Sequence, residues 1–262
     1  MSAPRVAAFI PAFHGNSYAK YRDVVVEVEQ LGVDVVLTTD HFFPQRGNPD
    51  GPNFECWSLL SAWSEATSNV EIGALVSSIG YRNPDLVADM ARTIDHISDG
   101  RLILGLGSGW MERDYLEYGY DFGTAGKRLD YLAEAIPRIK RRLGKLNPPP
   151  TRRLPILIGG GGVKKTLRIT AEHADIWHFF VDVDSYREKA AILADHCAAV
   201  GRDPDEIEHC AEVSEAPDPM DFTHRIHDAG VNLISVAVEA PDFDTALLKQ
   251  VLQWRDRLSS EV

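Results

Sequence analysis

Apolar and polar positions follow two periods along this chain, one typical of strands and one typical of helices. Short apolar runs indicate buried strands at residues 5–10, 33–38, 70–76, 101–106, 155–158, 175–178, 207–213 and 231–238. Between these runs, apolar residues recur every three or four positions. This spacing predicts amphipathic helices at residues 17–31, 55–67, 84–98, 124–143, 163–173, 184–200, 218–229 and 241–258.

The strict alternation of eight strands with eight helices predicts the fold class. Eight successive strand–helix units are what a (β/α)8 TIM barrel requires, and a doubly wound sheet rarely contains so many regular units in 262 residues. We therefore expect one α/β barrel domain covering residues 1–262. Pro137 is expected to kink its helix, and the proline-rich segment 144–154 is interpreted as a short surface loop.

Composition excludes several classes of partner. The chain carries 27 basic and 39 acidic residues, a net charge of −12, which argues against binding to nucleic acid or to an anionic membrane surface. Neither a membrane span nor a signal-peptide pattern is found, so we expect a cytoplasmic protein. Cys56, Cys197 and Cys210 are too few and too scattered to predict a disulfide framework or a metal site.

The most unusual stretch is LPILIGGGGVKKTL, residues 154–167, where four glycines join a predicted strand to a predicted helix. Four glycines in succession favour close approach of the backbone to a ligand, such as a phosphate at the first amides of a helix. Lys164 stands where a Walker loop needs its second glycine and where a dinucleotide fingerprint needs its third, so neither pattern fits. A tight turn without a ligand is the remaining alternative.

In a barrel, the chemically distinctive residues would share one end, because barrel enzymes act at the C-terminal ends of the strands. Histidines, aromatic residues and glycines follow the predicted strands. They are Phe13-His14, Thr39-Asp40-His41-Phe42-Phe43, Ser77-Ser78, Gly107-Ser108-Gly109-Trp110, Gly159 to Gly162 and His178-Phe179-Phe180. A rim of this composition indicates a flat ligand with a phosphate tail.

Several segments, in this order, resemble the bacterial luciferase-like flavin superfamily. They are TDHF at 39–42, YRNP at 81–84, TIDHISDGRLILGLGSGW, PILIGGGGVKKTLRITAEHADIW and LADHCAAVGRDPDEIE. The resemblance covers roughly residues 5–238 and is closest to the branch that uses the deazaflavin coenzyme F420. Its members are (β/α)8 barrels that hold FMN or F420 across the C-terminal mouth. It therefore implies an F420-dependent oxidoreductase that transfers a hydride to or from a small organic substrate.

Three other functions stay open. The first is an FMN-dependent monooxygenase on the same fold, and the second is a flavin-binding protein without turnover. The third is a phosphosugar aldolase or isomerase, although such barrels normally place a lysine or an acid pair at the strand ends. The resemblance also implies a homodimer, which is common among relatives.

The resemblance assigns roles to residues of the rim. The coenzyme phosphate would lie on Gly159, Gly160, Gly161 and Gly162. A bulge with a non-proline cis peptide bond, behind the reacting centre of the ring, maps to Ala74-Leu75. Ser77 would reach the ring edge, Gly107 and Ser108 would line the opposite wall, and Asp40 and His178 would complete the coenzyme pocket.

His41 is the catalytic candidate that the resemblance implies. Enzymes of this type often keep a histidine there to donate or accept a proton, and imidazole titrates near neutrality. The alternative is a histidine that only hydrogen-bonds Asp40 or the backbone. Trp110 stands where some F420 dehydrogenases carry an acid. Glu112 and Arg113 would either touch the ring or form an exposed ion pair.

The glycines do not discriminate between the two coenzymes, because FMN and F420 share a tricyclic ring and a ribityl phosphate. F420 adds an acidic tail, so basic side chains close to the phosphate would favour it. Lys164, Lys165 and Arg168 are the candidates, whereas Arg152 and Arg153 are expected at the opposite end of the barrel.

Overall fold

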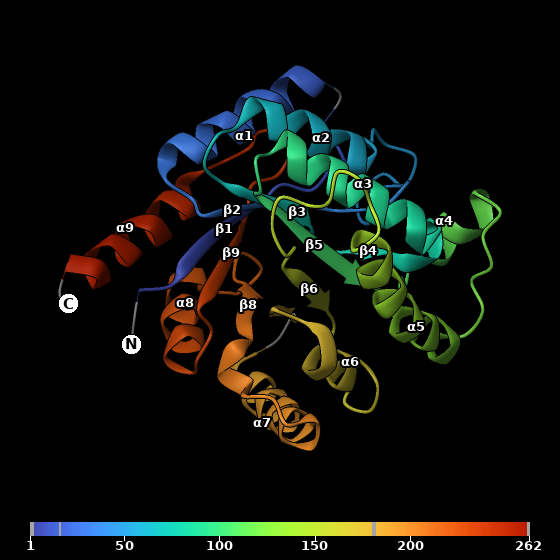
Figure 1. Ribbon diagram of the computed structural model, residues 1–262. Coiled ribbons are helices and arrows are strands. Elements are labelled where there is room, and N and C mark those ends of the chain that lie inside the picture. Colours follow the sequence, from blue (N-terminus) through green and yellow to red (C-terminus); the bar gives the residue numbers. More distant parts are fainter. Residues whose placement is uncertain (1–2, 16, 180–181, 261–262) are drawn as a thin grey trace.

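A closed barrel of parallel strands forms the centre of the molecule (Figure 1). The computed structural model describes residues 3–15, 17–179 and 182–260. The strand order is β3-β2-β1-β9-β8-β7-β6-β5-β4, and a further pairing of β3 with β5 closes the sheet. Every ladder in it is parallel. The (β/α)8 TIM barrel predicted from the sequence is confirmed.

The described residues form nine strands, of which β3 and β4 are the two halves of one barrel strand. Both halves pair with β5, Ile72 opposite Leu102 and Ser77 opposite Leu106. The strands are β1 (Arg5–Phe9), β2 (Val35–Thr38), β3 (Glu71–Ala74), β4 (Ser77–Ser78), β5 (Leu102–Gly107), β6 (Ile156–Gly159), β7 (Ile176–His178), β8 (Glu208–Glu212) and β9 (Leu233–Ala237).

The break between β3 and β4 lies one peptide beyond the expected position. The cis bond joins Leu75 to Val76, and the assignment to Ala74-Leu75 was wrong by one residue. The reason is the length of the β2–β3 ladder: Ala74 still pairs with Thr38, and the Leu75 amide still donates to the Thr38 carbonyl at 2.7 Å. The strand ends at Ala74, and the Leu75 amide continues its hydrogen bonding to β2 by one residue before the chain bulges.

Helices surround the barrel on its outer face (Figure 1). They are α1 (Tyr18–Leu31), α2 (Cys56–Ala66), α3 (Pro84–Ile97), α4 (Glu112–Glu117), α5 (Ala125–Leu143), α6 (Thr166–His173), α7 (Val183–Val200), α8 (Pro219–Asp228) and α9 (Ala246–Ser260). Helix α4 was not predicted, and α5 continues through Pro137. None of the helices in the described part of the chain is long and apolar enough to cross a membrane.

Local sequence explains where these helices begin. The Asn83 side chain accepts from the Asp85 amide and precedes Pro84, the first residue of α3. The Asp182 side chain caps α7 in the same way, through the amides of Asp184 and Ser185. Helix α6 begins at Thr166, three residues later than predicted, because residues 163–165 form a turn after the glycines.

The barrel interior is filled by apolar side chains, so open space is confined to its ends. The interior cluster consists of Ala7, Val35, Leu37, Ile103, Leu157, Ile176, Cys210 and Leu233. At the N-terminal end, Arg5 pairs with Glu71 and Glu208, and Arg152 pairs with Glu71 at 2.7 Å. Arg152 therefore lies at the end opposite the predicted site, as expected.

Candidate active site

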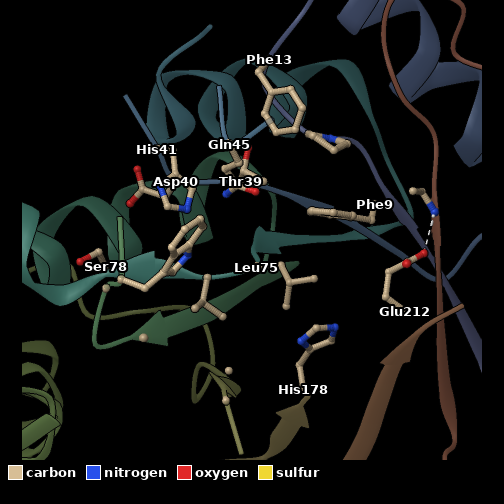
Figure 2. Close-up of a pocket in the computed structure, with 18 of the residues that line it drawn as sticks. Phe9, Phe13, Thr39, Asp40, His41, Gln45, Leu75, Ser78, His178 and Glu212 are labelled. Atoms are coloured by element: carbon tan, nitrogen blue, oxygen red, sulfur yellow. Dashed lines mark hydrogen bonds between the residues drawn. The ribbon is translucent and has the colours of Figure 1, made fainter. Parts of the chain in front are cut away.

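A cavity of about 580 Å³ opens at the C-terminal ends of the strands (Figure 2). A cavity of this volume is large enough for a drug-sized ligand. Eight of the predicted site residues line it: Asp40, His41, Leu75, Gly107, Ser108, Gly159, Gly160 and His178. The fold thus gathers side chains that are far apart in sequence around one space. Ala74, Ser77, Gly161 and Gly162 are not part of this lining.

The bulge between β3 and β4 forms one wall of the cavity. Leu75 and Val76 both line it. A Cβ atom at Gly107 would lie 2.5 Å from Cγ2 of Val76, so a glycine is needed for β5 to pass the bulge. Gly107 therefore has a packing role in addition to the ligand role that the resemblance implies.

Ser77 lies behind the cavity wall and is not part of the lining. It is buried, its hydroxyl donates to the Asp40 carboxylate, and it accepts from the Trp57 indole N–H at 3.1 Å. The next residue, Ser78, lines the cavity and hydrogen-bonds the Tyr115 hydroxyl at 2.7 Å. Ser77 acts on the site by holding Asp40, and Ser78, although also buried, is the serine that borders the cavity.

Asp40 is held by a buried ion pair. Nη1 and Nη2 of Arg82 donate to its two carboxylate oxygens at 2.6 and 3.0 Å, and Nη2 also reaches Glu55 at 2.7 Å. Burial alone would lower the pKa of Arg82, but the facing carboxylates of Asp40 and Glu55 raise it above its usual value. Arg82 therefore stays charged and neutralises Asp40 at the cavity wall.

His41 is paired with a carboxylate that the sequence analysis missed. Nδ1 of His41 lies 2.5 Å from Oδ2 of Asp114, a residue of α4 that is completely buried. Asp114 also accepts from the Tyr81 hydroxyl at 2.6 Å and from the Phe42 amide at 3.1 Å. Burial and the adjacent Asp114 raise the pKa of Tyr81, so its hydroxyl remains a donor. The partner of His41 is therefore Asp114 and not Asp40.

This pairing leaves the second ring nitrogen of His41 available. A carboxylate only accepts hydrogen bonds, so Nδ1 carries the proton that faces Asp114. Nε2 makes no hydrogen bond within the described residues, and His41 lines the cavity. The Trp110 ring, 61% exposed, lies edge-on to it with centroids 5.4 Å apart. An imidazole oriented by a carboxylate is suited to exchange a proton with a ligand in the cavity.

The glycine segment presents a row of backbone N–H groups. Gly160 has a φ of +119°, which favours glycine, and its own amide donates to the His178 carbonyl at 2.9 Å. By contrast, the amides of residues 161–165 donate to no backbone or side-chain acceptor in the described part of the chain. Free N–H groups before a helix bind anions. The segment fits a phosphate, with the free amides beginning at Gly161.

His178 contributes a neutral imidazole to the same wall. Burial lowers its pKa to about 4, so the ring is uncharged at neutral pH. Phe179 next to it also lines the cavity. Phe180, which the sequence analysis grouped with them, lies outside the described residues.

The remaining charged candidates are mostly paired with other side chains. Lys165 lies 2.5 Å from Asp130, and Arg168 lies 3.7 Å from Glu172. Arg113 pairs with Asp50 at 2.5 Å and stacks on Phe43, and neither it nor Glu112 lines the cavity. The exposed ion-pair alternative for Arg113 is thus the one the structure favours.

Residues 5–220 match the family model of the luciferase-like monooxygenases. The chain belongs to this luciferase-like family. Its matched segment contains the bulge, the His41–Asp114 pair and the glycine segment. The family resemblance seen in the sequence is thereby confirmed.

Two solved structures have the same luciferase-like fold over almost their whole length. An F420-dependent secondary alcohol dehydrogenase in complex with an F420–acetone adduct aligns with a TM-score of 0.82 and 16% identity, covering 96% of this chain and 98% of that one. The oxygenating constituent of 3,6-diketocamphane monooxygenase from Pseudomonas putida, in complex with FMN, aligns with a TM-score of 0.77 and 13% identity, covering 100% and 99%.

Among curated proteins, the luciferase-like chain is similar to pyrimidine monooxygenase RutA of Allorhizobium ampelinum. The two are 27% identical over 193 residues, which cover 64% of this chain and 49% of that protein. The match thus spans about half the length of this curated relative. These likenesses establish a luciferase-like oxidoreductase or monooxygenase fold whose relatives use either coenzyme.

Proposed function

We propose that this chain is an F420-dependent oxidoreductase that transfers a hydride between the deazaflavin and a small organic substrate. The observation that carries the proposal is the arrangement of one cavity. At one side, Gly159 and Gly160 line it and are followed by the free amides of residues 161–165. The Leu75–Val76 bulge lines it next to Gly159, and the lining also includes His41, whose Nδ1 is held by Asp114.

The residues present fit a flat phosphorylated coenzyme. The free amides offer a phosphate several donors at the start of α6, where the helix dipole also favours negative charge. Leu75, Val76 and the exposed Trp110 offer apolar surfaces for a ring system. When bound, F420 supplies a carbon that accepts or donates a hydride, which protein side chains cannot do.

In this proposal the chain's own residues position the reactants and move one proton. Nε2 of His41 takes the proton of a substrate hydroxyl during oxidation, or returns it to a carbonyl during reduction. The buried Asp114 keeps Nδ1 protonated and stabilises the imidazolium that forms when Nε2 is protonated.

A second hollow supports F420 over FMN. It has a volume of about 310 Å³, shares Ser108 with the main cavity and is lined by two basic side chains of α5, Lys127 and Arg128, and by one acid, Asp121. The free amides of residues 161–165 form the proposed phosphate seat. Lys164, one of these residues, forms no salt bridge within the described part of the chain. Lys127, Arg128 and Lys164 would offer positive charge to the acidic tail that F420 carries and FMN lacks. Because Lys165 and Arg168 are already paired, they add little to this preference.

An FMN-dependent monooxygenase is the second candidate. It is favoured by the similarity to a pyrimidine monooxygenase and to a structure containing FMN. The glycine segment serves either coenzyme equally. Homodimer formation and a cytoplasmic location stay predictions.

Titration of the coenzyme-free protein with F420 and with FMN, in parallel, tests the proposal. Trp110 lies at the cavity beside His41, so we expect a bound ring to quench its fluorescence. F420 is expected to bind at least about tenfold more tightly than FMN, because Lys127 and Arg128 of the second hollow would contact only the acidic tail of F420. A Trp110→Phe variant should lose most of the quenching while keeping the affinity measured by calorimetry.

Tight binding of FMN with no binding of F420 would reject the proposal in favour of the monooxygenase. Binding of neither coenzyme would reject both. If F420 binds but is never reduced or oxidised by any alcohol or ketone offered, the flavin-binding protein without turnover becomes the better account.

A further inference from the structure

Glu212 is a half-buried carboxyl group at the end of β8, on the side of the cavity away from His41 (Figure 2). Its Oε1 accepts from the Ser214 amide at 2.9 Å and from the Ala237 amide at 3.2 Å. These two bonds fix the orientation of the carboxyl group. Oε2 makes no hydrogen bond to any described residue, and so remains available to a ligand.

Among the described residues, no lysine or arginine forms an ion pair with Glu212. Arg225 lines an adjoining hollow that Glu212 also borders, but it pairs with Asp221 at 3.3 Å. Arg46 is the only lysine or arginine among the described residues lining the cavity. Its guanidinium is already engaged, with Nη1 2.7 Å from Glu215 and Nη2 in contact with Glu239. Glu215 and Glu239 also line the cavity, so this part of the space is acidic. The ion pairs of Arg46 leave Glu212 without a cationic partner.

Apolar rings flank the same region. Phe9, Phe13 and Phe179 line the cavity together with Glu212. Burial raises the pKa of Glu212, the bonds from Ser214 and Ala237 oppose this change, and the neighbouring Glu215 adds to it. An ammonium or hydroxyl group at Oε2 would supply the donor that the carboxylate lacks. A carboxylate or phosphate group there would be repelled by Glu212 and would have to compete with Glu215 and Glu239 for Arg46.

We propose that Glu212 binds the end of the substrate that points away from His41, and that it selects an ammonium or hydroxyl group there over an anionic group. This assignment rests on the proposed function, because it places a substrate in the cavity beside the coenzyme. It names a substrate class: a compact molecule with an oxidisable or reducible carbon at one end and a hydrogen-bond donor at the other.

Three probes of equal ring size test the assignment: trans-4-aminocyclohexanol, trans-1,4-cyclohexanediol and trans-4-hydroxycyclohexanecarboxylate. Their dissociation constants are measured by calorimetry near neutral pH, with coenzyme-loaded and with coenzyme-free protein. We expect the amino alcohol and the diol to bind roughly 10- to 100-fold more tightly than the carboxylate, as for a hydrogen bond to a charged group.

Glu212→Gln is the decisive variant. The amide oxygen still accepts from Ser214 and Ala237, so the loop geometry is kept. The amide NH2 group takes the place of Oε2 and is a donor instead of an acceptor. The variant should lose most of the preference for the amino alcohol and bind the carboxylate more tightly. Glu188→Gln removes the same charge from the exposed face of α7, outside the cavity. It should leave the ratios between the dissociation constants of the three probes unchanged.

An unchanged probe ratio in Glu212→Gln would overturn the assignment. A wild-type protein that prefers the carboxylate, or that binds none of the probes, would overturn it as well. Failure of the proposed function is recognised separately, as loss of coenzyme binding. In that case the ratios for the coenzyme-free protein still test Glu212.

Discussion

His41→Ala is expected to lower the turnover number by about 10²–10⁴-fold, the usual contribution of a general acid or base. The physical reason is the geometry of the pair, since Asp114 holds Nδ1 at 2.5 Å and directs Nε2 to the cavity. Steady-state rates of coenzyme reduction or oxidation, with the dissociation constant of the coenzyme measured beside them, provide the test. We expect the coenzyme affinity to change by less than about threefold, because His41 acts on the reaction rather than on binding.

Asp114→Asn is the matched positioning variant for this experiment. The asparagine keeps the shape of the buried side chain but removes the charge that stabilises the imidazolium, so turnover should fall less than in His41→Ala. Near-normal turnover in His41→Ala would leave His41 as a structural residue of the rim.

Gly160→Glu is expected to weaken coenzyme binding by roughly 100-fold or more, because it adds a negative charge beside the phosphate seat. The change also brings a side chain onto a residue with a φ of +119° and within 3.2 Å of Thr166. Both effects arise at the joint between β6 and the free amides of residues 161–165. Calorimetric titration with the coenzyme measures the loss.

Gly160→Ala separates these two causes. It has the same backbone strain and the same contact with Thr166 but no charge, so its affinity should lie between those of the wild type and Gly160→Glu. Thermal unfolding of both variants shows how much of the lost coenzyme affinity comes from a less stable folded protein. If folded Gly160→Glu bound the coenzyme with wild-type affinity, the phosphate would not bind at the amides that follow Gly160.

The architecture was predictable because it depends on local patterns. Short apolar runs identified all eight barrel strands, and the alternation with helices identified the barrel. The same reasoning placed the rim residues Asp40, His41, Gly107 and Gly160 at one end, where the structure gathers them around one cavity. Local patterns succeed here because the type and order of the elements follow from the periodicity of apolar residues within each segment.

The partners of the site residues were not predictable, because they depend on contacts between distant segments. Asp114 is separated from His41 by 73 positions, and α4, which carries it, is too short to show a clear helical period. Arg82 lay within the recognised YRNP segment, but nothing in that segment indicates its pairing with Asp40. The position of the cis peptide bond depended on how far the β2–β3 ladder extends, which no single-strand pattern shows.

A crystal structure of the protein with its bound coenzyme tests the central claim most directly. We expect the phosphate to accept hydrogen bonds from amides between Gly161 and Lys165. We also expect the ring to lie against Leu75 and Val76, with its reacting carbon on the side of Nε2 of His41. A phosphate bound elsewhere, or a ring that leaves His41 out of reach of the substrate, would contradict it.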